Sequence, residues 1–176
     1  MDPEKTITIP VSLDEKTFRR FAFFDTFILR KRWARPVIFS LILAAFAAVA
    51  LLARKAQSGM IASVLLVVGL GLPVVYVGSF LNQVNLQILR QKLKPARRVY
   101  TVTLREAGIT VRNDRKQEGT LELEWPALHR AYRKKGCVYL YVTPVKAFLL
   151  PDGQADAPDA EVWDYLKEHL GNEKCR

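Results

Sequence analysis

Two long apolar runs, separated by four residues, constrain this chain more than any other feature of its sequence. Neither the first run, 36–53, nor the second, 58–81, contains a charged residue. As α-helices with a rise of 1.5 Å per residue they would be about 27 and 36 Å long, compared with about 30 Å for the hydrocarbon core of a bilayer. The link 54–57 allows only an antiparallel return. The sequence therefore predicts a transmembrane hairpin of two helices.

The alternative to a membrane hairpin is a buried helical hairpin inside a soluble protein. This alternative is disfavoured because a chain of 176 residues can rarely surround two uncharged helices of this length. Neither run contains an ionisable side chain, so the sequence gives no sign of an ion or proton path. Pro73 removes one backbone hydrogen bond and is expected to kink the second helix. A channel or transporter would require a homo-oligomer of this hairpin.

Positive charge is concentrated beside the apolar runs. The formal net charge is +10, but residues 99–176 carry 12 basic and 12 acidic groups and are neutral, whereas residues 82–98 carry five basic and no acidic groups. This distribution suits anionic lipid head groups and argues against a nucleic-acid-binding face. The bases that flank the hairpin are here named the basic collar: Arg30, Lys31, Arg32, Arg35, Arg90, Lys92, Lys94, Arg97 and Arg98.

The basic collar also predicts the orientation of the hairpin. Its members precede the first run and follow the second, whereas the link contains only Arg54 and Lys55. By the positive-inside rule, both termini are expected in the cytoplasm and the link outside, in a multi-pass membrane protein. The first apolar run follows an acid-containing segment, so no signal peptide is expected.

Residues 1–35 are expected to form a strand and then a helix. Residues 6–10 alternate β-branched side chains and end at a proline, which is typical of a short edge strand. Ser12 and Glu15 fit a capping box for a helix over 13–33. Because this helix is rich in aromatic and basic residues, we expect it to lie in the membrane interface; its continuation into the first span as one bent helix is the alternative. Pro36 is expected to break the helix.

Residues 95–176 have the pattern of an antiparallel sheet followed by one helix. Apolar and polar residues alternate with a period of two, and the expected strands are 98–106, 109–112, 119–125, 129–133, 137–143 and 146–150. In the third of these, Leu121, Leu123 and Trp125 are expected to face inward. Pro158 and Gly171 bracket an amphipathic helix that should cover the sheet.

These parts together predict an α+β membrane protein. Residues 1–35 would be an N-terminal strand and an interfacial helix, residues 36–94 a transmembrane hairpin with a basic continuation, and residues 95–176 a cytoplasmic sheet domain.

The order of these parts and several short motifs carry a resemblance to a known family. The motifs are Val102-Thr103-Leu104, Glu106-Ala107-Gly108-Ile109, the strand into Trp125, Tyr139-Leu140-Tyr141 and Ala147-Phe148-Leu149-Leu150-Pro151. They resemble the YcxB-like family of bacterial membrane proteins. The resemblance implies a membrane location and a pleckstrin-homology-like (PH-like) C-terminal domain, but it implies no activity.

Groups that could carry chemistry are few. His129 and His169 have no further ligands at metal-binding spacing, and no serine follows Ser79, so neither a metal site nor a serine triad is expected. Cys137 with His129 would be a conceivable nucleophile and base, but a buried structural thiol is the usual role of such a cysteine. Cys137 and Cys175 are expected to be reduced. We therefore expect no enzyme and no cofactor.

One further set of bases belongs to the sheet domain. The β-hairpin patch is defined as Arg130, Arg133, Lys134 and Lys135. It is either a solvated loop or a contact for head groups or an acidic partner. The expected function is a membrane-anchored binding or scaffold module that recognises a protein segment or anionic lipid head groups. The alternative is a small oligomeric accessory subunit of a membrane transport system.

Overall fold

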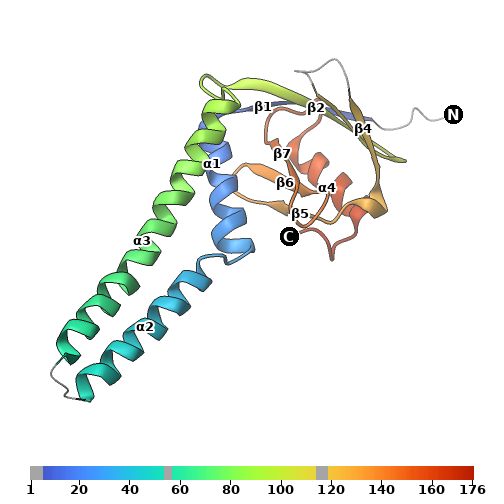
Figure 1. Ribbon diagram of the computed structural model, residues 1–176. Helices are drawn as coiled ribbons and strands as arrows, with labels where there is room; N and C mark the ends of the chain where they lie inside the picture. The colour runs from blue at the N-terminus through green and yellow to red at the C-terminus, as the bar shows by residue number, and fades with distance from the viewer. Residues whose placement is uncertain (1–5, 54–56, 114–118) are drawn as a thin grey trace. The chain divides into compact units, whose positions relative to one another are not determined.

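A computed structural model describes residues 6–53, 57–113 and 119–176. It shows an α+β protein, with two long apolar helices followed by antiparallel strands and a C-terminal helix, as expected (Figure 1). The chain divides into two compact units: residues 6–21 with 92–176, the sheet unit, and residues 22–53 with 57–91, the helical unit. The link residues 54–56 and residues 114–118, which include Glu118, lie outside the described residues.

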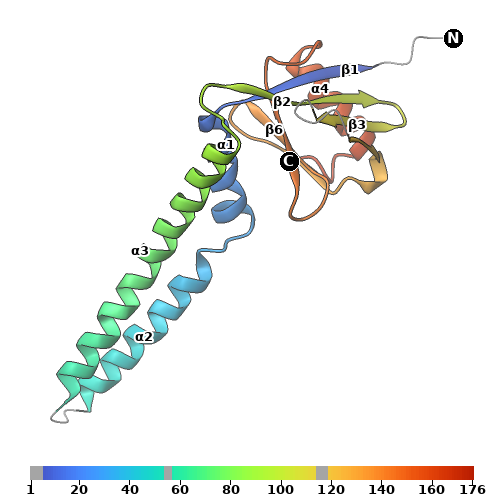
Figure 2. The same cartoon turned by 45° about the horizontal axis from the view of Figure 1, so that its top comes forward.

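The sheet unit contains two antiparallel sheets and one covering helix (Figure 2). The first sheet has the order β1-β2-β3-β4 and the second the order β5-β6-β7. Helix α4 (Asp159–Leu170) follows the last strand, and the 3-10 helix η2 (Trp125–Ala127) lies between the two sheets in sequence. The strands are β1 (Ile7–Leu13), β2 (Arg97–Arg105), β3 (Gly108–Asn113), β4 (Thr120–Glu124), β5 (Arg130–Arg133), β6 (Cys137–Tyr141) and β7 (Ala147–Pro151).

Strand β1, which precedes the apolar helices, pairs with β2, which follows them. The pairing is antiparallel and places Ile7 opposite Leu104 and Leu13 opposite Arg97. Buried and half-buried residues alternate along β1, so one face of the strand enters the core. The helical unit is thus inserted in sequence between two paired strands. This differs from the expected division at residue 35, because pairing partners more than 80 residues apart leave no local signal.

The outer edge of β1 is closed by the segment between β7 and α4. The Thr8 N–H donates to Asp156 Oδ1 at 2.8 Å, and the Asp156 N–H donates to the Thr8 carbonyl at 3.0 Å. The Ser12 N–H donates to Gln154 Oε1 at 2.7 Å, and Gln154 Nε2 donates to the Ser12 carbonyl at 2.9 Å. Pro10, which has no N–H, lies between these two sites. Residues from both sides of the insertion therefore hold β1 in place.

Tyr100 and Trp125 tie the rest of the sheet unit together. The Tyr100 hydroxyl of β2 accepts a hydrogen bond from the Leu149 N–H at 2.8 Å and donates to the Leu149 carbonyl at 3.0 Å, which joins the two sheets. The Trp125 ring is buried, its Nε1 donates to the Arg105 carbonyl at 3.0 Å, and its centroid lies 6.0 Å from the Tyr165 ring of α4. The inward position expected for Trp125 is correct.

Two local expectations for the sheet unit are wrong. Leu121 is 45% exposed, so the expected alternation fails at that position of β4. Helix α1 (Glu15–Phe23) is capped by Asp14 and not by Ser12, since Asp14 Oδ1 accepts the Thr17 N–H at 2.8 Å. Hydrogen bonding from Thr17 lowers the pKa of Asp14. Ser12 is unavailable as the cap because it still belongs to β1.

The helical unit begins in a π-helix and contains the two apolar helices. The π-helix η1 (Phe24–Leu29) continues α1, and it is followed by α2 (Ala34–Leu52) and α3 (Ser58–Arg90). Helices α2 and α3 pack along each other (Figure 1); a Cβ built on Gly69 would lie 3.5 Å from Leu43 Cβ. The helix expected over 13–33 is too long, because η1 ends at Leu29. The hairpin was expected to continue to Lys94, but α3 ends four residues earlier, at Arg90.

The break before α2 lies earlier than the position expected from Pro36. The helical hydrogen bonding stops at residues 30–33, where Lys31 has a φ of 48°. Ala34, Arg35 and Pro36 belong to the first turn of α2. Proline is compatible with a first turn because an N–H at that position has no partner within the helix.

Helices α2 and α3 are long and apolar enough to cross a membrane. Their apolar windows have mean hydropathies of 2.2 and 2.5, and only 6% and 11% of these windows are buried within the protein. A core hairpin of a soluble protein would be mostly buried. The outward apolar side chains of both helices thus have no cover from the described part of this chain.

The pairing of β1 with β2 predicts which fragment of the chain can fold alone. Residues 97–176 lack β1, whose four buried side chains would each contribute about 1.5–3 kcal/mol, a sum comparable to the stability of a small domain. We expect this fragment to be unfolded. A fusion of residues 6–21 to residues 92–176 through a flexible linker should fold. Circular dichroism and the dispersion of amide NMR signals would distinguish the two; a folded 97–176 fragment would contradict the role given to β1.

Candidate functional site

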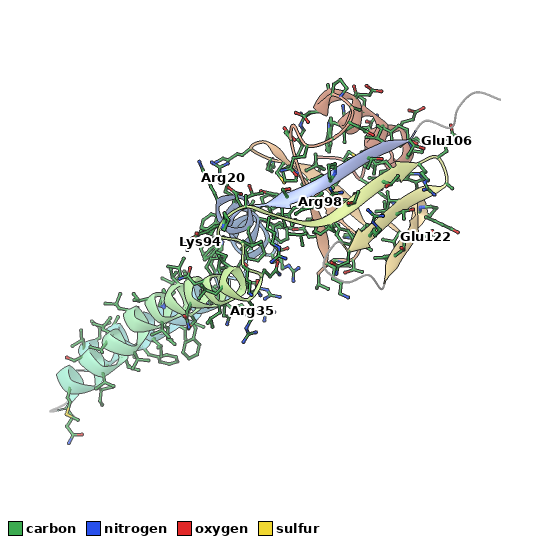
Figure 3. The ribbon with its side chains drawn as sticks, turned by 90° about the horizontal axis from the view of Figure 1, so that it is seen from above. Arg20, Arg35, Lys94, Arg98, Glu106 and Glu122 are labelled. Atoms are coloured by element: carbon green, nitrogen blue, oxygen red, sulfur yellow. The ribbon has the colours of Figure 1, made fainter. Side chains whose placement is uncertain are left out.

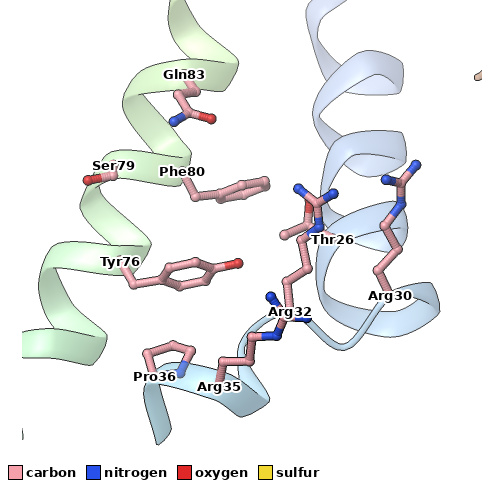
Figure 4. A pocket seen from close by; sticks show the side chains of 9 residues that line it. All are labelled: Thr26, Arg30, Arg32, Arg35, Pro36, Tyr76, Ser79, Phe80 and Gln83. Atoms are coloured by element: carbon pink, nitrogen blue, oxygen red, sulfur yellow. The ribbon is translucent and has the colours of Figure 1, made fainter. Parts of the chain in front are cut away.

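A pocket lies in the helical unit, between the end of the apolar run on α3 and the turn that leads into α2. We name residues 30–36 the elbow. The pocket has a volume of about 480 Å³, and its walls come from η1, the elbow and α3 (Figure 4). The lining residues are Thr26, Arg30, Arg32, Arg35, Pro36, Tyr76, Ser79, Phe80 and Gln83.

Hydrogen bonds to η1 hold the elbow in place. The Arg30 N–H donates to the Asp25 carbonyl at 3.0 Å, and the Arg32 N–H donates to the Thr26 carbonyl at 3.0 Å. The Trp33 indole Nε1 donates to the Phe27 carbonyl at 3.1 Å. The N–H groups of these residues thus satisfy carbonyls at the end of η1 that would otherwise have no partner within the helix. These bonds fix the backbone that carries Arg32.

Aromatic contacts fix the opposite wall relative to η1. The Phe27 ring lies 5.0 Å from the Phe80 ring and 6.3 Å from the Tyr76 ring, both in edge-to-face geometry. Tyr76, Phe80 and Gln83 share one face of α3 because they are four and three residues apart. Figure 4 shows the Tyr76 hydroxyl directed toward the elbow. The width of the pocket is therefore set by ring packing within the helical unit.

The electrostatics of the pocket favour an anion. Arg30 forms an ion pair with Asp25 of η1 at 2.9 Å, so the charge of Arg30 is balanced by this carboxylate. Arg32 and Arg35 are exposed, and no carboxylate among the described residues lies within ion-pair distance of either. None of the lining residues is acidic. The N-terminus of α2, whose first residue is Ala34, adds the positive end of a helix dipole beside them.

The structure places the basic collar in both units. Arg30, Lys31, Arg32, Arg35 and Arg90 belong to the helical unit, and Arg30, Arg32 and Arg35 share the pocket. Lys92, Lys94, Arg97 and Arg98 belong to the sheet unit. Of these, Lys94 Nζ is 2.6 Å from Glu15 Oε2, and Arg98 Nη2 donates to Thr101 Oγ1 at 2.9 Å. The collar is thus not uniform, since Arg30 and Lys94 have carboxylate partners.

Charge is divided between the two ends of the first sheet. Lys94 and Arg98 lie toward the end at which the chain leaves for the helical unit, whereas Glu106 and Glu122 lie at the other end (Figure 3). Both glutamates are exposed. These four side chains thus separate by sign along the sheet.

The β-hairpin patch lies at the turn between β5 and β6. Lys134 and Lys135 are exposed, and Lys135 with Gly136 forms a two-residue turn in which both φ angles are positive, 48° and 80°. Arg133 Nη2 is 3.5 Å from Asp152 Oδ2. The patch therefore offers exposed charge at a turn.

The packing around Cys137 and His169 indicates structural roles for these two side chains. Cys137 is 3% exposed, and burial raises the pKa of its thiol to about 12, so the nucleophilic thiolate is nearly absent at neutral pH. His169 stacks on Tyr165 at 4.2 Å between ring centroids, and its Nδ1 lies 2.9 Å from the Tyr165 carbonyl. His129 is exposed. The described residues include no group of three or more side chains arranged to hold a metal ion.

Comparison with known proteins bears on the sheet unit. Residues 104–170 match a family model described as YcxB-like protein. These residues are therefore YcxB-like. The match runs from the end of β2 to the end of α4, and it confirms the resemblance seen in the sequence. It includes neither β1 nor the helical unit with its pocket. No curated protein and no solved structure gives a significant match.

Sequence reasoning found the arginines of the pocket but missed its other wall. Thr26, Phe80 and Gln83 were not singled out, because their roles depend on the approach of α3 to η1. A local signal was nevertheless present: Tyr76 and Gln83 are seven residues apart, on one helical face, on either side of the point where the apolar run ends at Leu81.

The burial of Cys137 predicts its reactivity. At neutral pH we expect iodoacetamide to leave Cys137 unmodified in the folded protein, because the thiol is both covered and protonated. Unfolding in guanidinium chloride should expose it to rapid modification. Peptide mass spectrometry of labelled protein would measure both rates. Rapid labelling in the folded state would restore Cys137 as a candidate nucleophile.

Proposed function

We propose that this chain is a membrane-anchored binding module. In this proposal α2 and α3 cross the inner membrane as a hairpin, both termini are cytoplasmic, and the sheet unit is a PH-like domain at the cytoplasmic face. The protein acts by binding an anionic membrane surface or a protein segment, and not by catalysis.

The observation that carries the proposal is the insertion of the helical unit between β1 and β2. Two connections attach the sheet unit to the hairpin, one through α1 and one through residues 91–96. The second is six residues long, with a maximum contour length of about 20 Å. A membrane hairpin attached in this way would keep the sheet unit close to the bilayer. That is a useful property in a scaffold, since it raises the local concentration of the module at the surface.

Length, exposure and charge support the membrane assignment. Helix α2 has 19 residues, about 28 Å, which is close to the thickness of a hydrocarbon core. Bases of the collar flank the apolar part of the hairpin at its cytoplasmic side. Near an anionic leaflet each such base would contribute about 1 kcal/mol, so several together would hold the module against the surface.

The arrangement of the sheet unit supports the PH-like assignment. The resemblance implies an antiparallel sheet domain with a C-terminal helix, and the sheet unit consists of a four-stranded and a three-stranded antiparallel sheet followed by α4. Strand β1 is supplied from before the hairpin, so the complete domain would be made of two separated stretches of the chain.

An accessory role in transport is the second hypothesis. On α3, Cβ atoms built on Gly71 and Gly78 would meet nothing within 4 Å, so this helix has smooth surface that another helix could approach. The apolar runs contain no ionisable residue for an ion path. The binding hypothesis is therefore preferred.

The topology predicts the behaviour of reporter fusions. A fluorescent protein fused after Arg176 should be bright, and alkaline phosphatase fused at the same point should be inactive, because the C-terminus is expected in the cytoplasm. Insertion of phosphatase after residue 55 should give the active enzyme and serves as the control. Phosphatase activity at the C-terminal fusion would overturn the proposed orientation.

Contact with an anionic surface predicts protection of the collar from protease. We expect trypsin to cut the full-length protein after Lys92 and Arg97 more slowly in nanodiscs that contain phosphatidylglycerol than in nanodiscs of phosphatidylcholine alone. High salt should remove the difference, since it screens the attraction. Cleavage after Lys135, in the β-hairpin patch, is the internal comparison. Equal rates at the collar in both lipids would contradict a collar that contacts head groups.

A further inference from the structure

The donors of the pocket form a set that fits several oxygens of one anion. Arg32 and Arg35 approach from the elbow, and Tyr76 directs its hydroxyl toward them from α3 (Figure 4). A guanidinium group presents its N–H donors in a planar fork that matches two oxygens of a phosphate. Gln83 adds an amide one turn farther along the same wall. Two arginines and a hydroxyl that converge on one cavity suit a tetrahedral oxyanion better than a single carboxylate.

The elbow is organised before any ligand arrives. Backbone hydrogen bonds to η1 hold the elbow in place. Asp25, the carboxylate closest to the elbow in sequence, forms its ion pair with Arg30. Asp25 Oδ1 also accepts a hydrogen bond from Arg30 Nε at 3.1 Å. Arg32 and Arg35 are thus left with positive charge that this carboxylate does not balance. Pre-organisation of this kind lowers the entropic cost of binding.

The position of the pocket along both helices indicates where its ligand would come from. On α3 the apolar run ends at Leu81, between Tyr76 and Gln83, and on α2 Arg35 is followed at once by the apolar run that begins at Pro36. In a membrane, this level is the boundary between hydrocarbon and head groups. Lipid phosphates are concentrated at that depth.

The shape and lining of the pocket agree with a lipid. A volume of about 480 Å³ is larger than a phosphate needs and lies in the range of small-molecule sites. Phe80 and Pro36 give part of the wall an apolar surface. A phosphate that carries a glycerol backbone would place its charge on the arginines and its carbon atoms against these two residues.

We propose that the pocket between the elbow and α3 binds the phosphate of one anionic lipid head group, with Arg32 and Arg35 as its charged ligands and Tyr76 as a neutral donor. The inference rests on the proposed function, because it requires the hairpin to lie in the membrane. It goes further in assigning one defined site within an otherwise diffuse basic collar. Such a site would fix the height of the elbow relative to the lipid phosphates.

The test compares lipid binding to the full-length protein in detergent by native mass spectrometry. The probes are short-chain phosphatidic acid, short-chain phosphatidylglycerol, short-chain phosphatidylcholine and inorganic phosphate. We expect the wild-type protein to bind a single molecule of anionic lipid, at least tenfold more tightly than it binds phosphatidylcholine. Inorganic phosphate should compete only at much higher concentration, because it makes no contact with the apolar wall.

Variants separate the pocket from the rest of the collar. The double variant Arg32→Gln/Arg35→Gln should lose at least tenfold in affinity for the anionic lipid. The matched control Arg90→Gln/Lys92→Gln removes the same charge from the part of the collar outside the pocket. Because detergent offers these bases no anionic surface, it should change the affinity for a single lipid by less than threefold. Tyr76→Phe keeps the ring that packs on Phe27 and should weaken binding a few-fold.

A charge-conserving variant covers the case in which the double glutamine variant does not fold. Arg32→Lys/Arg35→Lys keeps both charges but loses the planar fork, and we expect it to fold and to bind several-fold more weakly. The melting temperature of each variant without lipid would confirm that it is folded.

The outcomes distinguish a failure of the pocket proposal from a failure of the proposed function. Equal losses in the pocket and control variants would overturn the pocket but leave a collar that attracts anionic lipid. No preference of the wild-type protein for anionic lipid would contradict both the pocket and the lipid role of the collar. Competition by inorganic phosphate at the same concentration as the lipid would show that a soluble phosphate is the ligand and would overturn the lipid assignment.

Discussion

The pairing of β1 with β2 is the constraint on which the rest of this structure depends. It brings Leu13 opposite Arg97 and so closes a loop in the chain that contains the whole helical unit. The hydrogen bonds of Thr8 and Ser12 to Asp156 and Gln154 hold β1 from its other edge. The entropic cost of closing a loop increases only slowly with the length of the loop. A long insertion at this point is therefore tolerated. The sheet unit is complete only when residues on both sides of the insertion come together.

The elbow has a comparable role in the helical unit. The carbonyls of the π-helix η1 accept hydrogen bonds from the N–H groups of the elbow that follows it. Phe27 contacts Phe80 and Tyr76, which sets the distance between η1 and α3. Arg32 and Arg35 therefore border a cavity of defined width instead of extending freely into solvent. The proposed lipid site follows from this geometry and from the level at which the apolar runs end.

Periodicity and turn chemistry predicted the elements that depend on near neighbours. The turn at Lys134-Lys135-Gly136, the inward Trp125, the C-terminal helix ending at Gly171 and the two apolar helices are all found. Each follows from residues within a few positions of one another. The errors occurred where a neighbouring element decided the outcome. Ser12 could not cap α1 because β1 continues through it, and Pro36 did not break a helix because the chain had already turned at Lys31.

The amino-acid sequence by itself determined the apolar hairpin, the location of the excess positive charge and the YcxB-like character of the C-terminal residues, because composition and short motifs express these properties locally. Only the tertiary structure decided that β1 belongs to the sheet unit, that Asp25 engages Arg30, and that Arg32, Arg35 and Tyr76 face one cavity. Strand partners and pocket walls are chosen by packing between segments far apart in the chain. That choice depends on the burial of complementary surfaces and leaves no pattern in either segment alone.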